Sequence, residues 1–137
     1  MKPVLIDSGP LIALFNKSDR YHEVSVEFIK INKRPIITSL ANITEVVYVL
    51  DYSNDAQSAF LKWIANSSII VEDIDSADIF EISQLFEKYR NVPMDFADAC
   101  IVHIAEKLQT NEIATIDSDF DIYKINGKKT FKNVLKT

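Results

Sequence analysis

The chain has 137 residues, of which 47% are hydrophobic and 26% charged, a balance typical of a globular domain with a core and not of a disordered chain. Its two glycines, Gly9 and Gly127, allow neither the G-x-G-x-x-G motif of dinucleotide-binding enzymes nor the G-x-x-x-x-G-K-[ST] motif of P-loop NTPases. The single Cys100 excludes a disulfide framework and a multi-cysteine zinc site, and two histidines, His22 and His103, argue against a histidine-rich metal site.

The charged residues are distributed unevenly along the chain. There are 20 Asp and Glu against 15 Lys and Arg, and the net charge of -5 disfavours a nucleic-acid partner because phosphate contacts require Lys and Arg. From Ile122 onward, however, no acidic residue occurs, and the segment carries Lys124, Lys128, Lys129, Lys132 and Lys136. Such a basic segment either attracts phosphate or keeps the protein soluble, and the sequence leaves both interpretations open.

Short strand-like segments alternate with longer helical segments. In chain order, the pattern predicts a strand at 2–6, a short helix at 11–15, a helix at 21–32, a strand at 34–38, a helix from 40 to 50 with Ser39 as its N-cap, a helix at 55–65, a strand at 68–71, helices at 77–89 and 94–108, a strand at 113–116 and a candidate fifth strand at 130–135. In the 77–89 helix, the side chains expected to face the core are Ile79, Ile82, Leu85 and Phe86.

This alternation predicts the fold class. Strands separated by helices of roughly 11 residues or more are typical of β-α-β crossovers, which give a parallel sheet with helices on both faces. We therefore expect an α/β fold, a three-layer α/β/α sandwich around a mainly parallel sheet of four to five strands, forming one domain over residues 1–137. With no signal peptide and no run of roughly 18 apolar residues, the sequence favours a cytoplasmic protein without a membrane span.

Two aspartates directly follow predicted strands. Asp7 comes after the first strand and Asp117 after the fourth. In an open parallel sheet, ligands bind outside the carboxyl ends of the strands, near the point where the strand order reverses, so both residues are candidates for a functional site. Aspartate is also common after strands as a turn former or a helix N-cap, which is the structural alternative for each.

Three further acids fall on predicted helices. Glu45 lies in a segment that is apolar on nearly every side, which predicts a buried helix in which an ionised carboxylate must be paired or bound to a metal. The alternative is a narrow exposed stripe through Asn42 and Glu45. Asp95 and Asp98 are three residues apart and can share one helix face, although an N-cap role for Asp95 and a helix-dipole role for Asp98 would be purely structural.

As a set, the acids predict a metal site. Asp7, Glu45, Asp98 and Asp117, with Asp95 nearby, are expected to meet in one pocket, and four adjacent carboxylates cannot all stay ionised without a cation. Ligands that are all oxygen atoms are preferred by Mg²⁺ and Mn²⁺ over zinc or copper. The chemistry that follows is metal-assisted phosphodiester hydrolysis, with one or two ions.

Four short motifs occur in order along the chain. They are Val4-Leu5-Ile6-Asp7-Ser8 followed by Leu11-Ile12-Ala13-Leu14-Phe15, then Thr44-Glu45-Val46, then Met94-Asp95-Phe96-Ala97-Asp98-Ala99, and last Thr115-Ile116-Asp117-Ser118-Asp119-Phe120. With these motifs the chain resembles the PIN-domain ribonucleases, particularly the small VapC-type toxins of toxin–antitoxin pairs. The similarity covers nearly the whole length.

The resemblance implies a Mg²⁺- or Mn²⁺-dependent endoribonuclease, with an RNA substrate, a homodimeric assembly and a cognate antitoxin that fills the acidic groove with a basic or aromatic segment. The acids that it implies as catalytic and metal-binding are Asp7, Glu45, Asp98 and Asp117, with Asp95 and Asp119 as accessory metal candidates. Ser8 and Thr115 match hydroxyl positions that orient a ligand or the substrate.

Other functions are considered beside this one. A PIN-like module that binds RNA or protein without cutting would require an incomplete acid set, and the set is intact. An aspartyl-phosphate phosphohydrolase usually has D-x-D after its first strand, whereas this chain has Asp7-Ser8-Gly9, and a receiver domain would need an adjacent acid pair there. His103, in the middle of a predicted helix, is interpreted as a surface or packing residue and not as a ligand.

Overall fold

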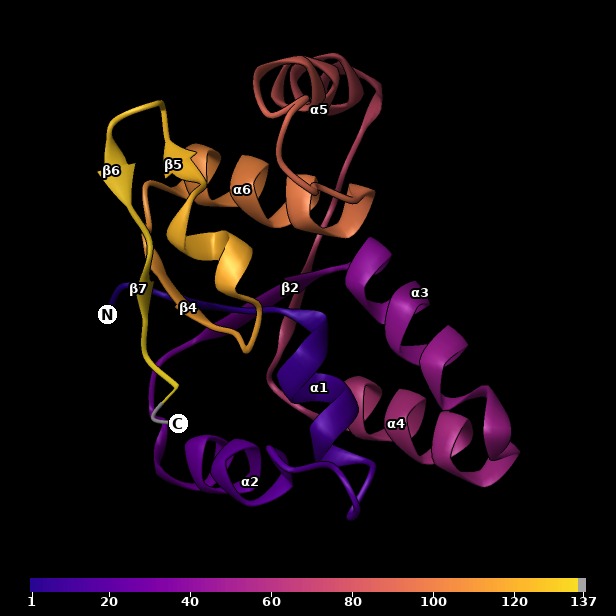
Figure 1. The fold of residues 1–137 in the computed structure, drawn as a ribbon. Coiled ribbons are helices and arrows are strands. Elements are labelled where there is room, and N and C mark those ends of the chain that lie inside the picture. The colour runs from indigo at the N-terminus through magenta and orange to yellow at the C-terminus, as the bar shows by residue number, and fades with distance from the viewer. Residues whose placement is uncertain (136–137) are drawn as a thin grey trace.

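A parallel five-stranded sheet forms the centre of the molecule. The computed structural model describes residues 1–135, and the strands run in the order β3-β2-β1-β4-β7 (Figure 1). Their bounds are β1 (Val4–Ile6), β2 (Ile36–Ser39), β3 (Ile70–Glu72), β4 (Glu112–Ala114) and β7 (Lys132–Asn133). Every neighbouring pair is parallel. The predicted mainly parallel sheet is therefore confirmed, with five strands.

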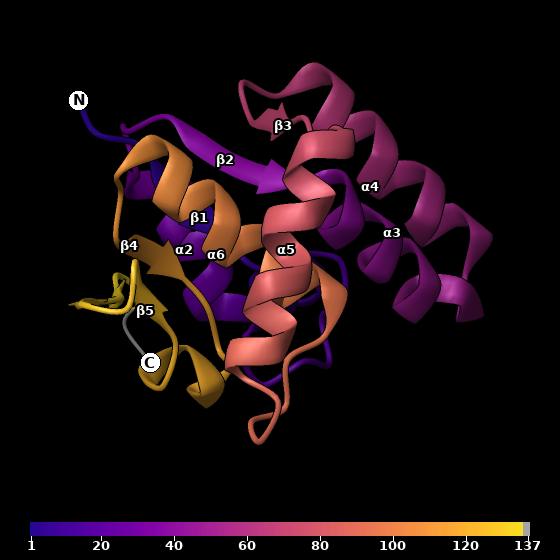
Figure 2. The ribbon, with the colours of Figure 1, turned by 90° about the horizontal axis from the view of Figure 1, so that it is seen from above.

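Helices cover both faces of this sheet, as Figures 1 and 2 show. One face carries α1 (Ser8–Leu14), α2 (His22–Ile31), α3 (Leu40–Val49) and α4 (Asn54–Asn66), and the other carries α5 (Ser76–Lys88) and α6 (Phe96–Leu108). In β1, Val4 and Ile6 pack into the first layer and Leu5 into the second, so the strand is buried on both sides. The three-layer sandwich is thus confirmed. Among residues 1–135, no helix is both long enough and apolar enough to cross a membrane.

The strand order reverses beside β1. From β1 the chain crosses to β2 on one side, whereas β4 returns to its other side, with Leu5 opposite Ile113 and Ile6 opposite Ala114. In doubly wound sheets, this switch point is where a crevice opens at the carboxyl ends of the strands. The residues that follow β1 and β4 therefore leave the sheet side by side.

The C-terminal segment departs from the prediction. The candidate strand at 130–135 is divided: β6 (Lys129–Thr130) pairs antiparallel with β5 (Lys124–Ile125) in a separate hairpin, and only β7 joins the main sheet. The turn residues Asn126 and Gly127 have positive φ values of 52° and 70°. An Asn-Gly pair is a strong hairpin signal, so the sequence did contain the information for this turn. Lys136 lies outside the described residues.

Two expectations about helix burial were wrong. The helix α3 is not buried on every side, because Leu40 and Tyr48 are 64% and 75% exposed. In α5, Ile82 and Leu85 are buried, whereas Ile79 and Phe86 are 47% and 40% exposed instead of facing the core. The physical reason is that α5 is an outer helix packed mainly on α6, so only a narrow stripe of its surface is covered.

Candidate active site

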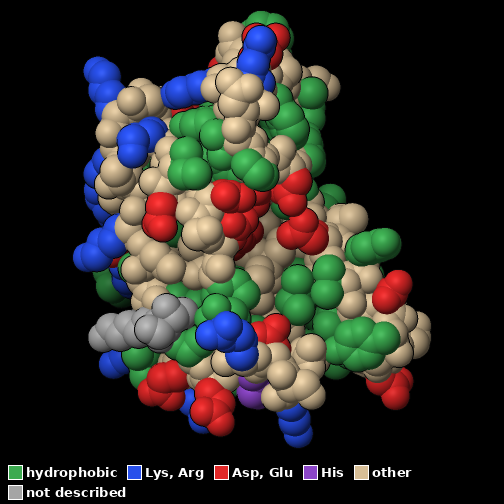
Figure 3. All heavy atoms as spheres, in the orientation of Figure 1, with side chains coloured by type: hydrophobic (Ala, Val, Ile, Leu, Met, Phe, Trp, Pro, Cys, Tyr) green, Lys and Arg blue, Asp and Glu red, His purple; other side chains and the backbone are tan. Residues whose placement is uncertain are grey.

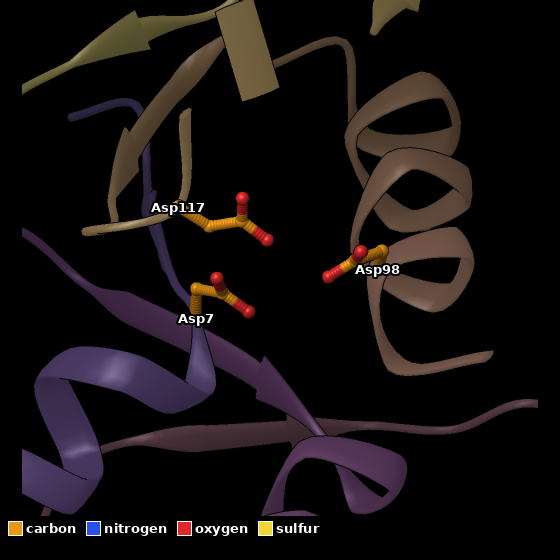
Figure 4. A group of neighbouring side chains, drawn as sticks. All are labelled: Asp7, Asp98 and Asp117. Carbon is orange, nitrogen blue, oxygen red and sulfur yellow. The ribbon is translucent and has the colours of Figure 1, made fainter. Parts of the chain in front are cut away.

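Three aspartates from separate parts of the chain converge at the switch point. Asp7 follows β1, Asp117 follows β4, and Asp98 projects from the first turn of α6 (Figure 4). One carboxylate oxygen from each lies within 4.8 Å of the others. The Asp7 amide donates to the Ala114 carbonyl (3.0 Å), which holds the ends of β1 and β4 together. The sequence-predicted meeting of these three acids is therefore observed.

A fixed hydrogen-bond network orients Asp7, which is 4% exposed. The Thr115 hydroxyl donates to Asp7 Oδ2 (2.9 Å), and the Asn42 side-chain amide donates to Asp7 Oδ1 (3.2 Å). The same Thr115 oxygen accepts from the Asp117 amide (3.0 Å), so one hydroxyl connects two of the acids. Thr115, predicted to orient a ligand or substrate, here positions a carboxylate.

Asn42 was missed as a site residue, and the alternative that placed it on an exposed stripe with Glu45 is wrong for Asn42. It is fully buried in the first turn of α3, where its amide also donates to Ser8 Oγ (2.9 Å). Its backbone N–H donates to the hydroxyl of Ser39 (3.1 Å), which confirms Ser39 as the helix N-cap. A buried amide with hydrogen-bonding partners on two sides holds both Asp7 and Ser8 in place.

A second contact orients Asp98. Tyr123 is fully buried and its hydroxyl lies 3.2 Å from Asp98 Oδ2 and also contacts the Pro93 carbonyl. Asp95 caps α6, since its Oδ1 accepts from the Asp98 amide (2.8 Å), so the structural alternative for Asp95 is confirmed. No local sequence pattern indicates the contact of Tyr123 with Asp98, because the two residues are 25 positions apart in the chain.

The other predicted acids lie around the three aspartates. Glu45 is half-buried on α3, and its pKa is raised by burial and by the nearby negative charge of Asp95. Asp117 Oδ1 accepts from the Asp119 amide (2.9 Å), and the pKa of Asp119 is raised by partial burial and by the charge of Asp117. Neither Glu45 nor Asp119 belongs to the close group of three.

His103 is a packing residue, one of the two roles predicted for it. His103 is buried in α6 with its Nε2 2.7 Å from Asp78 Oδ1, so it joins α6 to α5 and contributes no ligand to the aspartate group.

Burial and mutual repulsion change the protonation of the central acids. The pKa of Asp7 is raised to about 6, chiefly by burial and further by the charges of Asp117 and Glu45. The pKa of Asp98 is raised to about 8, again chiefly by burial, with added repulsion from Asp95, Asp7 and Asp117. Protons or a cation must balance such a cluster. Three convergent carboxylates offer only oxygen ligands, a donor set that fits Mg²⁺ or Mn²⁺.

A glycine permits the close approach of α1 to the segment after β4. A Cβ placed on Gly9 would lie 2.4 Å from Cγ1 of Ile116, closer than side-chain atoms pack. Gly9 is two residues from Asp7, and Ile116 is next to Asp117. The lack of a side chain at position 9 therefore lets the two aspartate-bearing segments lie against each other.

An apolar groove of about 760 Å³ opens beside the acids. Its walls come from α3, the segment before α5, α5 itself and the start of α6, and its apolar residues include Leu40, Ala41, Tyr48, Ile74, Ile79, Phe96, Ala97 and Cys100. The acidic residues at its edges are Glu45, Glu72, Asp73 and Asp95. Figure 3 shows hydrophobic side chains on both sides of the central acidic group. The groove thus joins an apolar surface to a negatively charged site.

Comparison with known proteins identifies the family. The model of the PIN domain matches residues 4–126. The chain belongs to the PIN-domain family. This PIN domain is 25% identical over 116 residues to Ribonuclease VapC26 of Mycobacterium tuberculosis, which covers 83% of this chain and 86% of that protein. The family resemblance stated from the sequence motifs is thereby confirmed.

Solved structures share the fold of this PIN domain. One is Mycobacterium tuberculosis VapC20, a Sarcin-Ricin loop cleaving toxin, with a TM-score of 0.80, 16% identity and coverage of 87% of this chain and 93% of that chain. Another is VapBC2 from Rickettsia felis bound to a DNA fragment from their promoter, with a TM-score of 0.64, 17% identity and coverage of 96% and 98%.

Proposed function

We propose that residues 1–137 form a single nuclease domain that acts in the cytoplasm as a Mg²⁺- or Mn²⁺-dependent endoribonuclease, hydrolysing phosphodiester bonds of RNA as the toxin of a toxin–antitoxin pair. The observation that carries the proposal is the convergence of Asp7, Asp98 and Asp117 at the switch point of a PIN-family sheet. The similarity to Ribonuclease VapC26 supports RNA as the substrate.

Each acid has a role in this proposal. Asp7, Asp98 and Asp117 would hold the cation, and Glu45 would complete the catalytic set from α3. When bound, the cation supplies a Lewis acid and lowers the pKa of a water molecule. Asn42 and Thr115 keep Asp7 aligned, and Tyr123 keeps Asp98 aligned.

The peripheral residues have supporting roles. The Ser8 hydroxyl, which interacts with Glu45 and Asn42, is placed to orient substrate. Asp95 and Asp119 remain accessory metal candidates.

The direct test is RNA cleavage by the purified protein. We expect cleavage of a structured RNA in Mg²⁺ or Mn²⁺, complete loss of cleavage in EDTA, and recovery when the metal is added back, because buried carboxylates require a cation to bind phosphate. Cleavage that persists in EDTA would contradict the metal mechanism. Binding of several RNAs without cleavage would support the alternative, a catalytically silent PIN-like binding module.

We also propose that the apolar groove is the docking site of the cognate antitoxin. Its apolar side chains and acidic edge fit a segment that carries apolar residues and a basic residue. The similarity to VapBC2 supports such a partner.

Two adjacent residues of α5 give a matched test of this docking site. Ile79 lines the groove, whereas Phe80 is exposed outside it. Because a buried isoleucine contributes roughly 1.5–3 kcal/mol, Ile79→Glu is expected to weaken inhibition by the cognate antitoxin by at least about tenfold. Cleavage of RNA should be unchanged. If Phe80→Glu weakened inhibition by the antitoxin as much as Ile79→Glu does, the antitoxin would bind outside the groove.

A homodimer would use a different surface. Val49, Tyr52 and Leu61 are exposed apolar residues at the α3–α4 edge that do not line the groove. We propose that this edge joins two copies of the chain. Light scattering should then give a mass near twice 15.6 kDa, and a monomeric mass at micromolar concentration would contradict the assignment.

A further inference from the structure

The C-terminal hairpin of β5 and β6 is rich in lysine. Lys124 belongs to β5, while Lys128 and Lys129 follow the hairpin turn. Lys88, at the end of α5, joins them, because its Nζ lies 3.0 Å from the position that a Cβ on Gly127 would take. These four lysines are called the basic hairpin surface. Figure 3 shows Lys and Arg side chains along the side of the molecule where Figure 1 places β5 and β6, next to the central acidic group.

Within residues 1–135, the lysines of this surface take part in none of the ion pairs. The ion pairs found within residues 1–135 involve other cations: Arg34, His103, Lys107 and Lys132. The Glu106 carboxylate below the turn already accepts a hydrogen bond from the Asn126 amide (2.6 Å). Lysines on a hairpin can protect exposed strand edges, but Lys88 comes from a helix and has no strand edge to protect. The combined surface instead has the charge that attracts a polyanion.

The hairpin is rigidly attached to the candidate active site. Tyr123, the residue before β5, contacts Asp98, and the Lys124 amide donates to the hydroxyl of Tyr89 (2.8 Å). The rings of Tyr89 and Phe120 pack edge-on against Tyr123. Four residues of extended chain span about 13 Å, so the hairpin turn lies within a few nucleotides of the aspartates. The basic hairpin surface therefore has a fixed position relative to the acids.

The acidic site creates a need for such a surface. The chain carries a net charge of -5, and carboxylates gathered at the switch point repel a polyanionic substrate. Exposed charges act mainly within a Debye length, about 8 Å at physiological salt, so lysines outside the site would favour RNA by contacting its phosphates directly.

We propose that the basic hairpin surface binds the phosphate backbone of RNA and directs the strand into the aspartate site. The inference rests on the proposed ribonuclease function and adds to it the residues that hold substrate outside the reaction centre.

The test compares two triple variants with the same change in charge. The hairpin variant combines Lys88→Gln, Lys128→Gln and Lys129→Gln. The control combines Lys17→Gln, Lys30→Gln and Lys62→Gln, which are exposed lysines in the loop after α1, on α2 and on α4, respectively. Both are made in an Asp7→Asn background and titrated in EDTA with a fluorescent single-stranded RNA. The salt slope is the dependence of the logarithm of the RNA-binding constant on the logarithm of salt concentration, and each neutralised phosphate of a single strand contributes about 0.7 to it. The slope of the hairpin variant should therefore be smaller by about 2, and its RNA affinity at low salt should be about tenfold lower or more. The control should change neither.

The outcomes separate this inference from the proposed function. Equal binding and an equal salt slope in the hairpin variant and the control would overturn the docking surface, even if the wild-type protein cleaves RNA. A hairpin variant of the active protein should raise KM with little change in kcat, whereas a lower kcat at constant KM would also count against docking. Loss of RNA affinity specific to the hairpin variant would support the surface even if the wild-type protein showed no cleavage.

Discussion

Asp7→Asn is expected to reduce the single-turnover rate of RNA cleavage by about 10³-fold or more. Asparagine has the size of aspartate but lacks its charge, so it binds the cation less well. A bound cation stabilises the transition state by several kcal/mol, and each 1.36 kcal/mol lost lowers the rate tenfold. Both carboxylate oxygens of Asp7 accept a hydrogen bond, from Thr115 and from Asn42, so asparagine keeps the volume and one of these two acceptors. The rate is measured with enzyme in excess over labelled RNA. Asp55→Asn, an exposed acid in the first turn of α4, is the matched control and should retain the wild-type rate.

The same substitution should stabilise the cation-free protein. It removes one of three closely spaced carboxylates that repel each other, and the pKa of Asp7 is raised chiefly by burial. We expect a higher Tm than wild type in EDTA at pH 8. Loss of activity together with a lower Tm would mean that the substitution acts by damaging the fold, and the catalytic assignment of Asp7 would then fail.

The affinity of the site for Mn²⁺ should increase with pH between about 5 and 9. The raised pKa values, about 6 for Asp7 and about 8 for Asp98, mean that these groups carry protons in the absence of a cation. A cation must displace the protons, so its binding weakens as the pH falls through these two values. Titration calorimetry at pH 5.5, 7 and 8.5 measures the trend. Asp98→Asn should remove the increase near pH 8, and an affinity independent of pH would contradict the assignment.

The stability of the cation-free protein follows the opposite trend. Between the ordinary aspartate pKa near 4 and the raised values, the native state holds more protons than the unfolded state. The free energy of unfolding therefore decreases as the pH rises from 5 to 8. Added Mn²⁺ at pH 8 should restore it, which a thermal unfolding experiment can measure.

The order of the elements explains why much of the site could be predicted from the sequence. Asp7 and Asp117 follow buried strands directly, and parallel strands end at one edge of the sheet, so their proximity depends only on the strand order. Asp98 required one more inference, that its helix begins at the same edge. Local sequence therefore determined these three positions.

Residues that act by tertiary packing were not predicted. Asn42 and Tyr123 reach partners 35 and 25 residues away, and no local pattern encodes such contacts. The predicted burial of α3 was wrong for a related reason. The apolar residues Leu40 and Tyr48 favour burial against another surface, but no other part of residues 1–135 packs over them. The hairpin turn at Asn126 and Gly127, in contrast, has a local sequence signal, the Asn-Gly pair, but was not predicted.

Gly9 has a consequence for the evolution of the family. Its missing side chain leaves room for Ile116, so the two positions share one volume although 107 residues separate them in the chain. A relative with alanine or serine at position 9 should carry a smaller residue at position 116. Positions 9 and 116 are thus expected to covary, and neither supplies an atom to the chemistry.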